Sequence, residues 1–174
     1  MTILRGRVHR FDPNDNINTD YIISGRYKFK IDDIRKLAEH VMEDIDPDFA
    51  SRIEKGDIIV AGRNFGCGSS REQAPRALKA AGVSVIIAES FARIFYRSAF
   101  NIGLPLLTCE TGWVRSGDLI EVDLSKGEIR RGSTGTVMST SRIPQVMQIL
   151  LSDGGLTSHI MKHNGFSLET DKME

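Results

Sequence analysis

A glycine-rich stretch followed by hydroxyl and charged side chains is the part of the sequence best suited to chemistry. Residues 62–75 read GRNFGCGSSREQAP and directly follow the apolar run DIIVA. Gly66 and Gly68 permit positive φ angles and a close approach of a ligand to the backbone. A helix that begins after them would offer free N–H groups and a dipole that favour an anion. Because Arg71 can add a bidentate contact to a carboxylate or phosphate, the stretch predicts an anion site.

Nucleotide and nucleophile motifs do not fit this stretch. A P-loop requires Gly-Lys followed by Ser or Thr, and the lysine is missing. A dinucleotide fingerprint needs a third glycine where this chain has Arg71, and GCGSSRE does not supply the G-x-S-x-G of a nucleophile elbow. A capping box between Ser69 and Glu72 is the purely structural alternative. Pro75 fits the first turn of a helix, so the regular helix could begin as late as Ala74.

The loop that precedes this stretch carries further charged groups. Residues 14–30 read NDNINTDYIISGRYKFK, in which Thr19 and Asp20 can order a turn. The basic side chains of this loop could meet an acidic substrate, or the loop could simply be solvated.

Histidines and cysteines give weaker signals. His159 and His163 have the i, i+4 spacing of metal ligands on a helix, but no HExxH glutamate accompanies them. We therefore expect them to cap or solvate a helix end. The chain has two cysteines, Cys67 and Cys109, which form no CxxC pair. We expect Cys67 to be a small packed residue in a tight turn.

The elements that position these groups alternate between strands and helices, which predicts an α/β fold with parallel pairing. The last third alternates around glycines and predicts antiparallel strands. In the helix expected over 90–103, an apolar stripe that includes Ile94 is assigned to the core, and Arg93 and Arg97 line a cleft or a partner surface. The expected strands are 3–11, 57–62, 83–88 and 104–108, the helices are 31–42, 70–82, 90–103, 143–155 and 156–163, and the irregular segments are 12–26 and 43–57.

Composition excludes several classes of protein. The chain has 174 residues, which suits one domain over 1–174, with a frayed polar tail over 163–174. Lys+Arg and Asp+Glu are 23 each, so no overall field favours nucleic acid or an anionic membrane. No apolar run has the length of a membrane span, and MTILRGRVHRF lacks the apolar core of a secretory signal. We expect a cytoplasmic protein.

Three segments in order carry a family resemblance: NTDYIISGRY, GDIIVAGRNFGCGSSREQAP and SFARIFYRSAFNIGLPLL. Together they closely resemble the small subunits of 3-isopropylmalate dehydratases, which are swivel domains of the aconitase superfamily. The match runs over about residues 3–110, and the β-rich remainder is compatible with it. The resemblance implies a three-layer swivelling β/β/α domain with a parallel core and a β-rich C-terminal annex.

The resemblance also implies an activity. Such enzymes are iron–sulfur-dependent hydro-lyases, which interconvert 2-isopropylmalate and 3-isopropylmalate by dehydration and rehydration in leucine biosynthesis. A large partner subunit holds the [4Fe-4S] cluster through three cysteines, and the two cysteines of this chain fit that division. The small subunit would be inactive alone and could form a homo-oligomer when isolated.

Residue roles follow from the same resemblance. Ser69 corresponds to the catalytic base, which must become an alkoxide to take a proton α to a carboxylate. Backbone N–H groups and a guanidinium in a water-poor site would stabilise that charge. A basic residue of the preceding loop, Arg26 or Lys28, adds a substrate contact. The other substrate contacts implied are Asp20, Gly68, Ser70 and Arg71.

The loop before the glycine stretch implies the choice of substrate. Homoaconitase-type relatives carry YLRT there, and aligning Tyr27 with its tyrosine places Phe29 at the arginine that binds a third carboxylate. An apolar Phe29 suits an isopropyl group. Because of Lys28 and Lys30, the small subunit of a homoaconitase is an alternative. The small subunit of a citramalate or dimethylmalate dehydratase is a further alternative. A stand-alone anion-binding module and a purely structural subunit are the alternatives from other classes.

Overall fold

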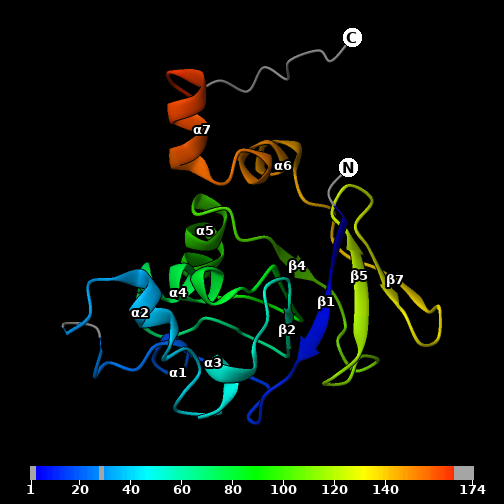
Figure 1. The fold of residues 1–174 in the computed structure, drawn as a ribbon. Helices are drawn as coiled ribbons and strands as arrows, with labels where there is room; N and C mark the ends of the chain where they lie inside the picture. The colour runs from blue at the N-terminus through cyan, green and yellow to red at the C-terminus, as the bar shows by residue number, and fades with distance from the viewer. Residues whose placement is uncertain (1–2, 28–29, 167–174) are drawn as a thin grey trace.

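The computed structural model describes residues 3–27 and 30–166. These residues form a seven-stranded sheet with the strand order β4-β3-β2-β1-β5-β6-β7. In Figure 1 the helices lie to the left of the strands and above them. The strands are β1 (Ile3–His9), β2 (Ile58–Ala61), β3 (Val85–Ala88), β4 (Leu106–Thr108), β5 (Leu119–Asp123), β6 (Glu128–Arg131) and β7 (Val137–Ser139).

The parallel half of the sheet is the core of the molecule. β1 pairs with β2, β2 with β3 and β3 with β4, all in parallel. Every residue of β2 and β3 is buried, as expected for apolar, β-branched strands that are covered on both faces. The parallel order predicted from the sequence is confirmed.

The C-terminal strands form the antiparallel half, which was also predicted. β5 pairs with β6 and β6 with β7, and both pairs are antiparallel. β1 joins the two halves, because it also pairs antiparallel to β5 over Ile3–Arg7. Within the sheet, the β-rich annex therefore pairs with the parallel core through β1.

The helix predicted over 156–163 has the predicted bounds, and the other predicted helices are shorter than their apolar patterns indicated. The helix expected over 31–42 is regular only in α2, and the two segments predicted to be irregular each contain one helical turn, α1 and α3. α4 ends at Gly82, whose φ is 114°, as the sequence predicted. The helices are α1 (Thr19–Ile22), α2 (Ile34–Ala38), α3 (Phe49–Arg52), α4 (Gln73–Ala81), α5 (Arg93–Asn101), α6 (Gln145–Ser152) and α7 (Leu156–His163).

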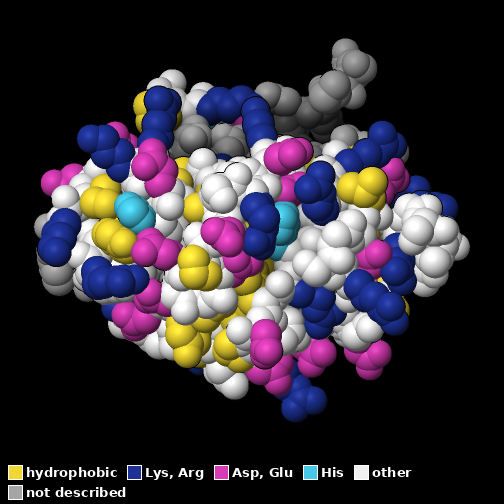
Figure 2. Space-filling model, turned by 60° about the horizontal axis from the view of Figure 1, so that its bottom comes forward, with side chains coloured by type: hydrophobic (Ala, Val, Ile, Leu, Met, Phe, Trp, Pro, Cys, Tyr) yellow, Lys and Arg dark blue, Asp and Glu magenta, His cyan; other side chains and the backbone are white. Residues whose placement is uncertain are grey.

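The structure describes only the first residues of the predicted C-terminal tail. Of the predicted tail over 163–174, His163 belongs to α7, and residues 167–174 lie outside the described residues. On the face shown in Figure 2, acidic and basic side chains are interspersed. Within 3–27 and 30–166, no helix combines the length and apolar character that a membrane crossing requires.

Candidate active site

Three loops meet at the carboxyl end of the parallel strands. Loop 14–20 follows β1, loop 62–71 follows β2 and loop 89–92 follows β3. The N–H of Gly66 donates to the carbonyl of Ile17 at 2.7 Å, and the N–H of Ala92 donates to the carbonyl of Phe65 at 2.9 Å. Ligand sites of open α/β sheets lie at this edge, because the loops that follow the parallel strands converge there.

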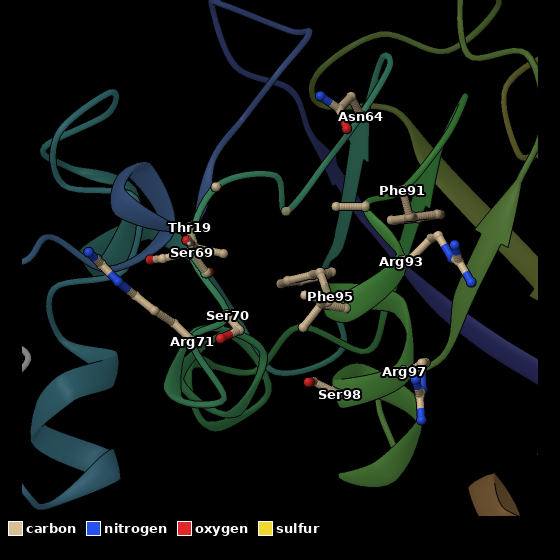
Figure 3. Close-up of a pocket in the computed structure, with 14 residues that line it drawn as sticks. Thr19, Asn64, Ser69, Ser70, Arg71, Phe91, Arg93, Phe95, Arg97 and Ser98 are labelled. Carbon is tan, nitrogen blue, oxygen red and sulfur yellow. Dashed lines mark hydrogen bonds between the residues drawn. The ribbon is translucent and has the colours of Figure 1, made fainter.

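A cleft of about 590 Å³ opens where these loops meet the first turns of α5. In Figure 3 the serine pair lies across the cleft from the aromatic and basic side chains of α5. The predicted residues Gly68, Ser69, Ser70 and Arg71 all line it, so the structure brings the glycine stretch and the arginines of α5 into one site. The other lining residues are Thr19, Asn64, Gly66, Phe91, Ala92, Arg93, Ile94, Phe95, Arg97 and Ser98.

The two glycines of the loop adopt the positive φ angles that were predicted. Gly66 has a φ of 78° and Gly68 a φ of 92°. A Cβ at Gly66 would lie 2.2 Å from Cγ of Phe95, and a Cβ at Gly68 would lie 3.4 Å from Oγ1 of Thr19. Gly66 is therefore required both by the backbone angle and by the close approach of a buried ring.

The capping box predicted between Ser69 and Glu72 is wrong. α4 begins at Gln73, its N-cap is Glu72, and no side chain caps that end. Ser69 therefore precedes the helix instead of capping it. The late start follows from Pro75, which lies in the first turn of α4 and has no N–H to bond there.

Ser69 is held through its backbone, and its hydroxyl faces solvent. Oγ1 of Thr19 donates to the carbonyl of Ser69 at 2.9 Å, and Thr19 is buried. Ser69 and Ser70 are exposed. Neither hydroxyl is hydrogen-bonded to another residue of the described ranges, so both are available to a ligand.

Arg71 ties the glycine stretch to α1. Its Nη2 lies 2.5 Å from Oδ1 of Asp20, and its Nη1 donates to the carbonyl of Ile23 at 2.8 Å. The side chain is 11% exposed, whereas that of Asp20 is 54% exposed. In Figure 3 the guanidinium extends away from Phe95, toward the loop that carries Thr19.

One atom of this guanidinium is unsatisfied. Nε of Arg71 is buried and has no hydrogen-bond partner in the part of the chain that the structure describes. A buried donor without a partner costs about 1–3 kcal/mol. The internal contacts of Arg71 therefore leave one donor of its guanidinium unused.

Of the other predicted loop residues, Asp20, Arg26 and Tyr27 are described by the structure and do not line the cleft. Arg26 pairs with Asp44 at 2.5 Å and with Glu43 at 3.6 Å. The hydroxyl of Tyr27 donates to Glu43 at 3.0 Å, and its ring stacks on His40 at 3.9 Å. Burial, followed by the bond to Glu43, raises the pKa of Tyr27. Lys28 and Phe29 lie outside the described residues.

Ile94 and Thr19 are among the lining residues that were misassigned or missed from the sequence. Ile94 was assigned to the core with its helical stripe, but its side chain is 57% exposed at the cleft. The reason is that α5 begins only at Arg93, so Ile94 lies in its first turn, at the mouth of the cleft. Thr19 was considered only as a turn residue. The polar run before α1 was a signal for it, because Asn18 caps α1 and orients the residue that holds Ser69.

The prediction for the histidine pair is also wrong. His159 does not solvate a helix end, because its side chain is 0% exposed and its Nδ1 lies 2.7 Å from Oδ2 of Asp153. His163 lies 3.0 Å from the same oxygen. Hydrogen bonds from Lys162 and His159 hold the pKa of Asp153 well below its usual range.

Comparison with known proteins identifies clear relatives. The family model for the aconitase C-terminal domain matches residues 14–111. The chain is 51% identical over 163 residues to 3-isopropylmalate dehydratase small subunit 2 of Archaeoglobus fulgidus, covering 94% of this chain and 98% of the relative. It is 55% identical over 162 residues to the methanogen homoaconitase small subunit of Methanothermobacter thermautotrophicus, covering 92% of each.

A solved structure agrees with these relatives. The crystal structure of 3-isopropylmalate dehydratase from Methanocaldococcus jannaschii superposes with a TM-score of 0.89 at 42% identity. The superposition covers 94% of this chain and 96% of that one. The mixed sheet and its helices are therefore the fold of that protein.

Proposed function

Because the chain belongs to the aconitase C-terminal domain family, we propose that it is the small subunit of a hydro-lyase that interconverts 2-isopropylmalate and 3-isopropylmalate. The reaction removes water from one isomer and adds it back to the neighbouring carbon, a step of leucine biosynthesis. Relatives that span nearly the whole chain carry the name 3-isopropylmalate dehydratase small subunit. The observation that carries the proposal is the pair of free serine hydroxyls in a cleft beside a buried arginine.

Ser69 acts in this proposal as the base that takes the proton α to a substrate carboxylate. The serine side chain acts as a base in its deprotonated form, an alkoxide. An alkoxide is unstable in bulk water and needs a site with hydrogen-bond donors and little water. The glycine loop and Arg71 supply backbone N–H groups and positive charge close to Ser69. Because the cleft is open and both serines are exposed, the exclusion of water has to come from a second protein surface.

The residues of this chain do not fit an iron–sulfur cluster. Such a cluster needs three cysteine ligands here, and the whole chain has two cysteines. Cys67 donates to the carbonyl of Asn16 at 3.5 Å. Burial, followed by the charges of Glu110 and Glu89, raises the pKa of the Cys109 thiol to about 11, which disfavours the thiolate that a metal requires. We therefore assign the cluster to a large partner subunit, which also closes the cleft.

The proposed substrate has one specific alternative, the substrate of a homoaconitase. The homoaconitase small subunit of Methanothermobacter thermautotrophicus is as similar to the chain as the isopropylmalate relatives are. An apolar Phe29 would leave a third carboxylate unpaired, which favours isopropylmalate. Comparison of kcat/KM for isopropylmalate, homocitrate, citramalate and dimethylmalate in the reconstituted complex decides between them.

The base assignment is tested with Ser69→Ala in the complex reconstituted anaerobically with its large subunit. We expect kcat to fall by roughly 10²–10⁴-fold, the usual contribution of a positioned acid or base, with assembly unchanged. Ser133→Ala, which alters an exposed serine outside the cleft, serves as the control and should keep its full rate. Near-normal turnover of Ser69→Ala would refute the assignment.

A further inference from the structure

Three metal-ligating side chains meet at the turn between α6 and α7. Asp153 is the C-cap of α6, and His159 and His163 lie one helical turn apart on α7. One ring nitrogen of each histidine and one carboxylate oxygen of Asp153 all lie within 4.8 Å of one another. No other group of this kind is found within residues 3–27 and 30–166, and none of the three residues lines the cleft.

The fold positions these ligands before any ion binds. Gly154 and Gly155 have φ angles of 86° and 118°, and this turn brings Asp153 onto the face of α7 that carries both histidines. A Cβ at Gly155 would lie 2.5 Å from the carbonyl oxygen of Asn101, so the turn is packed directly against the end of α5. Because the ligands are already in place, an ion would not have to order them.

Hydrogen bonds already draw the three side chains together. Nδ1 of His159 and Nε2 of His163 converge on the same oxygen, Oδ2 of Asp153, at 2.7 and 3.0 Å. Nε2 of His159 is buried and has no partner in the described part of the chain. Lys162 holds the other carboxylate oxygen at 2.6 Å. Two imidazoles and a carboxylate are thus directed at one small, largely buried volume.

The chemistry of these ligands selects the ion. Imidazole nitrogen and carboxylate oxygen suit Zn²⁺ and its neighbours in the first transition row, whereas Ca²⁺ and Mg²⁺ prefer oxygen alone. Three protein ligands leave one tetrahedral position for water. The His163 side chain is 24% exposed, which opens a path to solvent, while those of His159 and Asp153 are 0% and 4% exposed.

We propose that Asp153, His159 and His163 form a binding site for a divalent transition metal ion of the zinc class. The ion links the end of α6 to α7 and stabilises the C-terminal helix pair. The site is separate from the cleft, so the proposal does not depend on the proposed activity.

The test uses the full chain, stripped with a chelator and titrated with ZnCl₂ at neutral pH in a calorimeter. We expect one Zn²⁺ per chain and a melting temperature that rises by several degrees when zinc is in excess. His163→Gln keeps a polar side chain and should weaken zinc binding by roughly tenfold or more. His40→Gln is the matched control, because His40 also bonds an acidic side chain, Glu43, but belongs to no three-ligand group. It should bind zinc like the wild type.

Two results would overturn the proposal. One is the absence of saturable, stoichiometric zinc binding by the wild-type chain. The other is equal zinc affinity in the wild type and His163→Gln. Because loss of His163 could also unfold α7, the melting temperature of each variant without zinc is measured, and Asp153→Asn provides a second variant with the same expected loss of binding.

Discussion

Gly66 lies at the bend of the loop that carries the two serines, with a φ of 78° and the Phe95 ring 2.2 Å from where its Cβ would be. Gly66→Ala should lower the free energy of unfolding by about 2–4 kcal/mol, because a left-handed backbone and a displaced buried ring both cost energy. Thermal and denaturant unfolding measure the change. Gly112→Ala is the control, since nothing lies within 4 Å of that position. Equal stability of the two variants would contradict this account of the loop.

At the scale of residues, the sequence predicted which side chains form the site better than how they are held. The glycines and Arg71 were singled out by their types and order and the serine pair by the family resemblance, and all of them line the cleft. The bond from Thr19 to the carbonyl of Ser69 and the bond from Arg71 to the carbonyl of Ile23 were not predicted. Both join residues that are about fifty positions apart, and local patterns contain no information on such contacts. No motif indicated that His159 and His163 would converge on Asp153, because the turn at Gly154 and Gly155 is what brings this residue onto α7.

The start of β2 is attached to β1 by the buried carboxylate of Asp57. This carboxylate accepts hydrogen bonds from Nε2 of His9 at 2.7 Å and from the N–H groups of Glu54 and Arg7 at 3.0 and 3.2 Å. Burial raises the pKa of Asp57, but these hydrogen bonds outweigh burial and leave the pKa below its ordinary value. The ionised carboxylate therefore stabilises the pairing of the two strands.

Asp57→Asn should accordingly destabilise the chain by on the order of 1–3 kcal/mol at pH 7. A lowered folded-state pKa gives stability that is complete above the unfolded value, about 3.9, and is lost as pH falls through the lower folded value. The difference between wild type and variant should therefore shrink as the pH falls below 4. Urea unfolding at each pH measures it, and a difference that does not change with pH would contradict the role of the charge.

The elements themselves were predictable in proportion to their length and apolar content. The strands that are now β2 and β3 were found because continuous β-branched runs are buried on both faces. α1 and α3 were missed because a helix of one turn has almost no periodicity to detect. They form because Asn18 caps α1 and because Phe49 of α3 is fully buried. Short helices of this kind depend on tertiary contacts, which the sequence does not display.

At the scale of the whole molecule, the proposed function makes the cleft one part of an active site that a large subunit completes. One wall of the cleft ends at α5, where Ile94 is 57% exposed and lines the cleft together with Arg93 and Arg97. In Figure 3 the two guanidiniums lie on the side of the cleft opposite Arg71. An apolar side chain exposed at the mouth of a site that needs water excluded is suited to contact with the subunit that closes it.

Ile94→Glu should therefore weaken the complex with the large subunit by roughly tenfold or more, because a charge would be buried at the contact. The isolated variant should keep its unfolding free energy to within about 0.5 kcal/mol, since the site is exposed on the free chain. Calorimetric titration of the large subunit, done anaerobically, measures the affinity. Leu119→Glu is the matched control, because Leu119 is 65% exposed on β5 and does not line the cleft. If both variants bound the large subunit as tightly as the wild type does, the cleft wall formed by α5 would not be the contact surface.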